Sequence, residues 1–229
     1  IWGFLPLYLI LVQTVPAFEF VGWRIIWTLP LCLLIALFRK QGGELRAALG
    51  NRRTVGWLAL SASLIAVNWV VYVWAIQTGE VYAASLGYYI NPLVNVLLGT
   101  ALLGERLTRP QWLAVGIAAV GVSLLAAGAV TTLWISLTLA LTFGTYGLIR
   151  KRVVVGSVPG LTIESLLLLL PSIGVVWYYA QTQGSSFAVS TELSLSIMLG
   201  GVLTAVPLLM FAIAARKLPY SMLGFIQFL

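Results

Sequence analysis

Polar side chains interrupt an apolar segment, residues 83–105, that is long enough to cross a bilayer. On a helix, Tyr88, Asn91 and Asn95 stand at positions i, i+3 and i+7 and therefore share one face. Pro92 has no amide hydrogen to donate, and its ring crowds the carbonyl of Tyr88, so we predict a helix break there. Hydrocarbon offers such polar groups no partners. This face is therefore predicted to line a path along which a substrate is held by hydrogen bonds.

A second polar stripe lies in the preceding apolar segment. Helical spacing brings Asn68 and Tyr72 to one face, while Trp69 and Trp74 are expected to point elsewhere. We place Asn68 and Tyr72 on the same path. The alternative is a structural interhelical hydrogen bond, which is worth about 0.6 to 2 kcal/mol in a membrane.

Two charged residues fall inside predicted membrane-spanning segments. Arg24 lies roughly 10 Å from one end of its segment, and a charge at that depth is costly enough to mark a functional candidate. The alternative is that Arg24 snorkels to the lipid headgroups, helped by Glu19 at i−5. Glu164 is a candidate for proton coupling, or else an ordinary interfacial glutamate. Because they lie near opposite membrane surfaces, Arg24 and Glu164 are not expected to pair.

Further candidates come from position alone. Tyr146, together with Trp2 and Tyr8, is expected to add aromatic lining to the path. Gln227, in the second half of the chain, is expected to be the counterpart of the polar face of residues 83–105. Glu105 is expected to cap the helix that follows it or to pair with a nearby arginine in solvent.

The residue types that are missing argue against most enzyme chemistry. The chain has no histidine, and its single cysteine, Cys32, lies in an apolar run, which rules out a disulfide framework within the chain. The sequence contains no nucleotide-binding loop, metal-ligand cluster or nucleophile–base pair. We therefore predict no enzyme activity, no cofactor and no metal site.

Composition defines the class of protein. Hydrophobic residues make up 61% of the chain and charged residues 8%, and the mean hydropathy is +1.03. A soluble domain has about a quarter charged residues, so the sequence predicts an all-α polytopic membrane protein. The first and last helices are expected to be incomplete. The predicted helices span residues 1–14, 17–38, 54–77, 81–103, 109–128, 132–149, 160–180, 194–215 and 219–229.

The basic residues follow a topological pattern. All but one of the 13 Lys and Arg residues fall in alternate connections between the predicted helices, and Arg24 is the exception. By the positive-inside rule these connections are cytoplasmic, as is the amino terminus. The formal charge of +7 is therefore a topology signal and predicts no nucleic-acid partner.

An internal repeat divides the chain. Residues 64–76 (LIAVNWVVYVWAI) align without gaps with residues 203–215 (LTAVPLLMFAIAA), and LGY at 86–88 resembles LGF at 223–225. Chance similarity between apolar helices is the alternative. We predict a ten-helix bundle of two inverted five-helix repeats, residues 1–128 and 129–229, truncated within helices 1 and 9 and lacking helix 10.

Several of these segments resemble one known family. The stretches NWVVYVWAIQTG (68–79), SLGYYINPLVNVLLG (85–99), GERLTRPQW (104–112), TFGTYGLIRKRV (142–153) and LPYSMLGFIQFL (218–229) are similar to those of RarD-type permeases. These permeases, often labelled chloramphenicol-sensitive proteins, belong to the EamA group of the drug/metabolite transporter superfamily. The resemblance implies ten helices in two EamA repeats, a bacterial inner-membrane location and transport of small metabolites or drugs.

The chain departs from the family pattern at three positions. Trp23 stands where the family often has a histidine, Ala83 where a glutamate is common, and Glu80 near another common histidine. These departures argue against a proton-driven mechanism that depends on those groups.

The residues and the resemblance together predict a secondary transporter, working by alternating access, that exports small amphipathic metabolites, amino acids or drugs such as amphenicols. Aromatic walls and amides suit a stacked, hydrogen-bonded ligand that is neutral or zwitterionic. The predicted partners are a small-molecule substrate and the lipid bilayer; proton coupling is left open and no oligomeric state is predicted. The alternatives are a non-transporting membrane scaffold or receptor and an intramembrane enzyme, which a transport assay separates.

Overall fold

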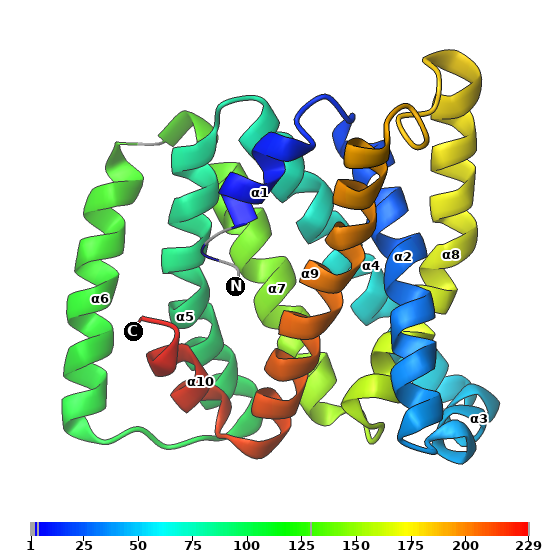
Figure 1. Cartoon of the computed structure of the whole chain (residues 1–229). Coiled ribbons are helices and arrows are strands. Elements are labelled where there is room, and N and C mark those ends of the chain that lie inside the picture. The colour runs from blue at the N-terminus through cyan, green and yellow to red at the C-terminus, as the bar shows by residue number, and fades with distance from the viewer. Residues whose placement is uncertain (1–2, 4, 129, 229) are drawn as a thin grey trace.

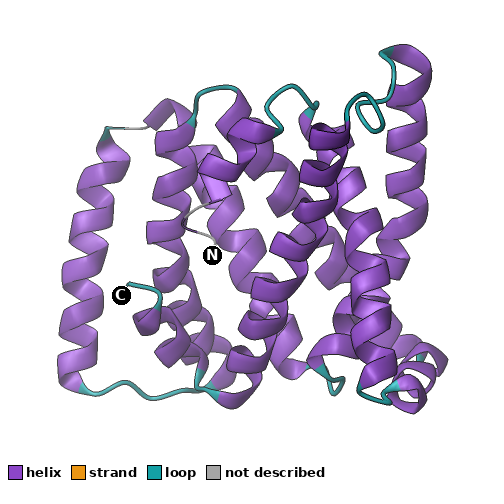
Figure 2. Cartoon of the chain, in the orientation of Figure 1, coloured by secondary structure: helices purple, strands orange, loops and turns teal. Residues whose placement is uncertain are grey.

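The computed structural model describes residue 3 and residues 5–128 and 130–228, and in these residues every regular element is a helix (Figures 1 and 2). The all-α prediction is confirmed. The α-helices of the described residues are α1 (Leu5–Leu11), α2 (Ala17–Phe38), α3 (Gly42–Gly50), α4 (Arg52–Gln77), α5 (Val81–Leu103), α6 (Arg109–Ala127), α7 (Leu133–Arg152), α8 (Ser157–Thr182), α9 (Thr191–Lys217) and α10 (Tyr220–Ile226).

Seven of the described helices, namely α2 and α4 to α9, are long and apolar enough to cross a membrane. The polytopic prediction is confirmed, because each of these helices matches a predicted span within a few residues. One helix was not predicted. Residues 42–50, expected to lie in a connection, form α3, which packs against α8 and α4.

The basic residues gather at one end of the bundle, which we call the basic face. Figure 1 shows α3 and the α5–α6, α7–α8 and α9–α10 connections together at this end, opposite the α1–α2, α4–α5 and α8–α9 connections. All Lys and Arg residues except Arg24 lie in these elements, in the α2–α3 connection or in the helix turns that adjoin them. The alternate connections that carry the basic residues in the sequence therefore lie at the same end of the bundle.

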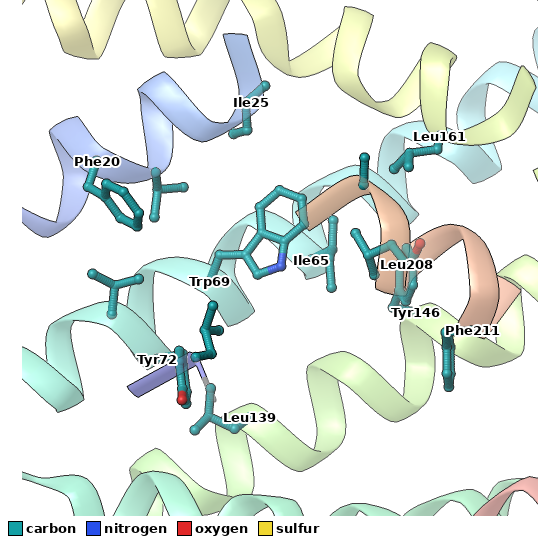
Figure 3. Packing of buried hydrophobic residues seen from close by; sticks show 14 of the residues in the cluster. Phe20, Ile25, Ile65, Trp69, Tyr72, Leu139, Tyr146, Leu161, Leu208 and Phe211 are labelled. Atoms are coloured by element: carbon teal, nitrogen blue, oxygen red, sulfur yellow. The ribbon is translucent and has the colours of Figure 1, made fainter. Parts of the chain in front are cut away.

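The helices pack in both parallel and antiparallel pairs. Helix α2 lies along α8 and α9, while α5 lies against α7 and α10, and α4 joins the two groups through α7. Figure 3 shows Trp69 of α4 at the centre of the buried cluster, between Phe20 of α2 and Leu139 of α7. Since lipid is as apolar as these side chains, tight van der Waals packing holds such helices together.

The predicted helix break at Pro92 is wrong, because α5 runs without interruption from Val81 to Leu103. A proline removes one hydrogen bond from the helical ladder, but packing against neighbouring helices can hold a transmembrane helix in shape. Helix α10 supplies such packing. A Cβ at Gly224 would lie 2.6 Å from the carbonyl oxygen of Pro92, so only glycine lets α10 approach α5 this closely.

Candidate functional site

A cavity of about 420 Å³ lies among α2, α4, α5, α7 and the ends of α1 and α10. Its lining on α4 comes from the half of that helix away from the basic face, and its lining on α5 comes from the half that begins at the opposite end. The cavity therefore lies in the half of the bundle away from the basic face. Its polar lining consists of Arg24, Asn68, Tyr72, Ser85, Tyr88, Tyr89, Asn91 and Gln227, and its larger apolar lining includes Trp69, Ile76, Leu139 and Phe143.

The cavity is lined by six of the eight residues predicted for the substrate path, which come from α2, α4, α5 and the end of α10. Two predicted residues, Asn95 and Tyr146, do not line it. Trp69, expected to point elsewhere, does line it. Trp2 lies outside the described residues, and Tyr8 is buried with its hydroxyl donating to the carbonyl oxygen of Ser196 at 2.7 Å.

Aromatic rings form one wall of the cavity. The rings of Tyr72 and Tyr88 meet edge to face with centroids 5.7 Å apart. Tyr72 is buried, whereas Tyr88 is 49% exposed. An aromatic wall with polar hydroxyls suits an amphipathic ligand that presents a flat apolar surface.

Three amides meet at the end of the cavity formed by α10. The Nδ2 atoms of Asn91 and Asn95 both donate to Oε1 of Gln227, at 3.1 and 2.7 Å. Asn95 is fully buried behind Gln227, so it orients Gln227 and does not face the cavity. The structure thus brings Gln227 to the polar face of α5, and Asn91 and Gln227 present the amide groups that a ligand can contact.

Asn68 makes an interhelical hydrogen bond, which was the structural alternative to a place on the substrate path. Its Nδ2 donates to the carbonyl oxygen of Leu139 at 2.9 Å and to Oγ1 of Thr142 at 3.0 Å. Asn68 therefore ties α4 to α7 and also lines the cavity.

Arg24 enters the cavity from α2. Only 3% of the residue is exposed, so the snorkelling alternative is wrong. Its Nε donates to Oγ1 of Thr204 at 2.8 Å, and its guanidinium carbon lies 5.2 and 5.5 Å from the ring centroids of Trp69 and Phe20. In the described part of the chain its Nη1 has no hydrogen-bond partner. Glu19 instead accepts hydrogen bonds from the amide and hydroxyl of Ser186.

A second polar cluster, formed by Ser61, Arg150 and Glu164, lies toward the basic face. Its side chains are fully buried and do not line the cavity, so we call it the closed cluster. Glu164 of α8, 1% exposed, accepts a hydrogen bond from Oγ of Ser61 at 2.7 Å and lies 3.7 Å from Nε of Arg150. Arg150 also donates to the carbonyl oxygen of Ser157 at 3.1 Å. As expected, Glu164 does not pair with Arg24. It is a buried member of an ion pair and not an interfacial glutamate.

Arg150 is the residue that sequence reasoning missed. It was assigned to a connection, but α7 continues through Arg152 and buries Arg150 to 1% exposure. A signal was available, because a buried Glu164 needs a cation and the short α7–α8 connection puts Arg150 at a similar depth. Tyr146, one turn before Arg150, packs against Phe143 and Phe211 in this half of the bundle, which keeps it out of the cavity.

Glu105 joins the two halves of the chain at the basic face, which corrects its expected local contacts. Its carboxylate accepts hydrogen bonds from the amides of Tyr220 and Ser221, at 2.6 and 2.8 Å, and from Oγ of Ser221 at 2.6 Å. Burial by itself raises the pKa of this carboxyl, but the hydrogen bonds from Ser221 and Tyr220 outweigh it and lower the pKa. Glu105 thus caps α10, the helix that carries Gln227 to the cavity.

Comparison with known proteins agrees with a bundle of membrane-spanning helices. Residues 1–127 match the model of the EamA-like transporter family. The chain belongs to this family, and it is therefore a membrane transporter by family.

Curated relatives define the type more closely. An uncharacterized transporter of Pseudomonas aeruginosa is 46% identical over the whole chain and 77% of its own length. Protein RarD of Streptomyces exfoliatus is 42% identical over the whole chain and 73% of its length, and protein RarD of Escherichia coli is 38% identical over the whole chain and 78% of its length. Within the EamA-like family this chain is a RarD-type permease. No solved structure matches the chain.

Proposed function

We propose that this protein is a secondary transporter that exports small amphipathic metabolites, amino acids or drugs such as amphenicols across the bacterial inner membrane. The observation that carries the proposal is the membrane-embedded cavity, whose 420 Å³ would enclose a small ligand and whose lining combines one cation, aromatic rings and amides. The names of the relatives support transport but specify no substrate.

The cavity and the closed cluster support a mechanism of alternating access. The cavity lies in one half of the bundle, while Arg150, Glu164 and Ser61 fill the half toward the basic face. We propose that this conformation is open away from the basic face, and that transport requires the Arg150–Glu164 contact to separate as the cavity turns toward that face. If protons drive transport, Glu164 is the carboxylate proposed to carry them.

We further propose that the chain consists of two inverted repeats, residues 1–128 and 129–229, with the basic face and the amino terminus in the cytoplasm. The antiparallel packing of α2 against α8 and of α5 against α10 supports this division, because these pairs are the second and fourth helices of each repeat. A two-fold axis in the membrane plane between such pairs is the arrangement of many secondary transporters.

Transport by purified protein in vesicles tests the proposal. Amino acids and amphenicols are offered with and without an imposed proton gradient, to wild type and to Arg24→Ala and Asn91→Ala. Gln181→Ala, an exposed amide on α8, serves as control. We expect Gln181→Ala to match wild type and both cavity variants to lose transport of at least one compound. Wild-type rates in both cavity variants for every transported compound would contradict the site, and no transport of any compound by wild type would contradict the function.

A further inference from the structure

The cavity contains one buried cation that lacks a counterion. Among the residues that the structure describes, Arg24 is the single Lys or Arg that lines the cavity, and no aspartate or glutamate lines it. In the described residues the six acidic side chains form one ion pair, between Arg150 and Glu164. The charge of Arg24 is thus left uncompensated by the described protein.

The protein satisfies Arg24 only in part. Thr204 accepts from Nε, and the rings of Trp69 and Phe20 stabilise the guanidinium by cation–π contact, but Nη1 has no partner among the described residues. Burying a cation without an anion is costly, and a guanidinium fork fits a carboxylate by two parallel hydrogen bonds. An anion of carboxylate geometry would therefore complete the partners of Arg24.

We propose that Arg24 binds the carboxylate of the transported substrate, and that the substrate is an aromatic or amphipathic monocarboxylate. This inference rests on the proposed function only in taking the ligand of the cavity to be its transport substrate. A single cation favours a single negative charge over a phosphate dianion. The rings of Trp69, Tyr72 and Tyr88 provide the surface for the rest of the molecule, and Asn91 and Gln227 can bond a polar group at its far end.

The same lining predicts what the substrate does not need. An ammonium group would find amide and hydroxyl oxygens but no carboxylate in the cavity, because none of the lining residues is acidic. The carboxylate should therefore dominate recognition, and an α-ammonium group should add little. This distinguishes the proposal from a site built for zwitterionic amino acids.

Binding to the wild-type protein in lipid nanodiscs, measured by titration calorimetry, tests the proposal without a variant. The probes are hydrocinnamate, its neutral amide and phenylalanine, which share one phenyl group and chain. We expect hydrocinnamate to bind about 10- to 100-fold more tightly than the amide, the effect of a charge-assisted hydrogen-bond pair, and at least as tightly as phenylalanine. Equal affinity for acid and amide, or no binding of the acid at millimolar concentration, would overturn the proposal.

Variants then assign the effect to Arg24. Arg24→Gln should reduce the preference for acid over amide to near unity and Arg24→Lys should retain part of it, while Arg39→Gln, exposed at the basic face, should leave it unchanged. A folded Arg24→Gln protein with the full preference would overturn the assignment, and if that variant does not fold, Arg24→Lys decides. Binding of hydrocinnamate through Arg24, with no transport of any compound into vesicles by wild type, would sustain the carboxylate site while contradicting the proposed function.

Discussion

Two buried arginines show how the two halves of this bundle differ. Arg150, toward the basic face, has a carboxylate at 3.7 Å and donates to a backbone carbonyl, and the cluster around it is closed. Arg24, in the other half, has one hydroxyl acceptor and two aromatic faces, and it lines the cavity. The first arrangement suits a contact between helices, and the second suits a ligand. The same residue type at similar burial is thus assigned two roles by its partners.

The largest effect on stability is expected from replacing Arg150, the arginine that is paired with Glu164. Arg150→Met leaves the charge of Glu164 buried without a cation, so we expect a loss of about 3–5 kcal/mol in the free energy of unfolding, measured in detergent by denaturant titration. Lys217→Met, an exposed residue at the same face, should change it little. Replacing both partners, Arg150→Met with Glu164→Leu, should recover much of the loss; a double variant as unstable as the single one would contradict the pairing.

A smaller loss is expected from crowding the same arginine. A Cβ at Gly160 would overlap the guanidinium of Arg150, whereas a Cβ at Gly174, on the same helix, would meet nothing within 4 Å. Gly160→Ala should therefore cost about 1–3 kcal/mol, the usual range for overpacking, and Gly174→Ala should cost far less. Thermal unfolding of the two variants side by side measures the difference, and equal midpoints would mean that Arg150 does not occupy the space beside Gly160.

Glu105 gives the closed half a dependence on pH. Because its pKa is lowered on folding, its contribution to stability is present above the unfolded value near 4.5 and is lost as the pH falls through the folded value. Wild type should therefore lose more stability on acidification below pH 4.5 than Glu105→Gln. At neutral pH the variant should be less stable by about 0.5–2 kcal/mol, the usual worth of a helix cap. Parallel pH profiles of the two proteins would contradict the assigned capping contacts.

The smallest effect on stability is expected from the unpaired arginine. Arg24→Gln leaves no carboxylate unpaired, and it removes the cost of burying an unpaired cation, which offsets the lost hydrogen bond to Thr204 and the lost contacts with Trp69 and Phe20. The net loss should therefore stay below about 1 kcal/mol. Unfolding of Arg24→Gln beside Arg150→Met measures this contrast directly. A loss from Arg24→Gln as large as that from Arg150→Met would show that Arg24 also serves mainly as a structural contact.

The spans could be predicted from sequence because hydropathy, length and charge placement are properties of each segment alone. Contacts between segments could not be predicted in this way. Glu105 bonds to Ser221, far along the chain, and nothing in its neighbourhood indicates that helix. Periodicity placed Asn68 and Tyr72 on one face but did not show that Trp69 shares the same cavity.

Two residues of the cavity lining could be predicted from the energetic cost of burying a polar side chain. Buried polar groups in an apolar span need partners, so Arg24 and Asn91 were identified by their burial cost alone. The end of a helix is harder to place than its middle, and an error of three residues at the end of α7 left Arg150 in a connection. Pro92 misled the prediction because the packing that keeps α5 continuous comes from α10.

The proposed difference in access between the cavity and the cluster of Ser61, Arg150 and Glu164 can be measured by cysteine labelling. In a Cys32→Ala background, Ser85→Cys lies in the cavity lining and Ser61→Cys in the closed cluster, and a thiol reagent that cannot cross the membrane is added from either side of sealed vesicles. We predict that Ser85→Cys reacts from the side opposite the basic face, that hydrocinnamate slows this reaction, and that Ser61→Cys reacts from neither side. Equal labelling of both positions, or labelling of Ser85→Cys only from the basic face, would contradict the account.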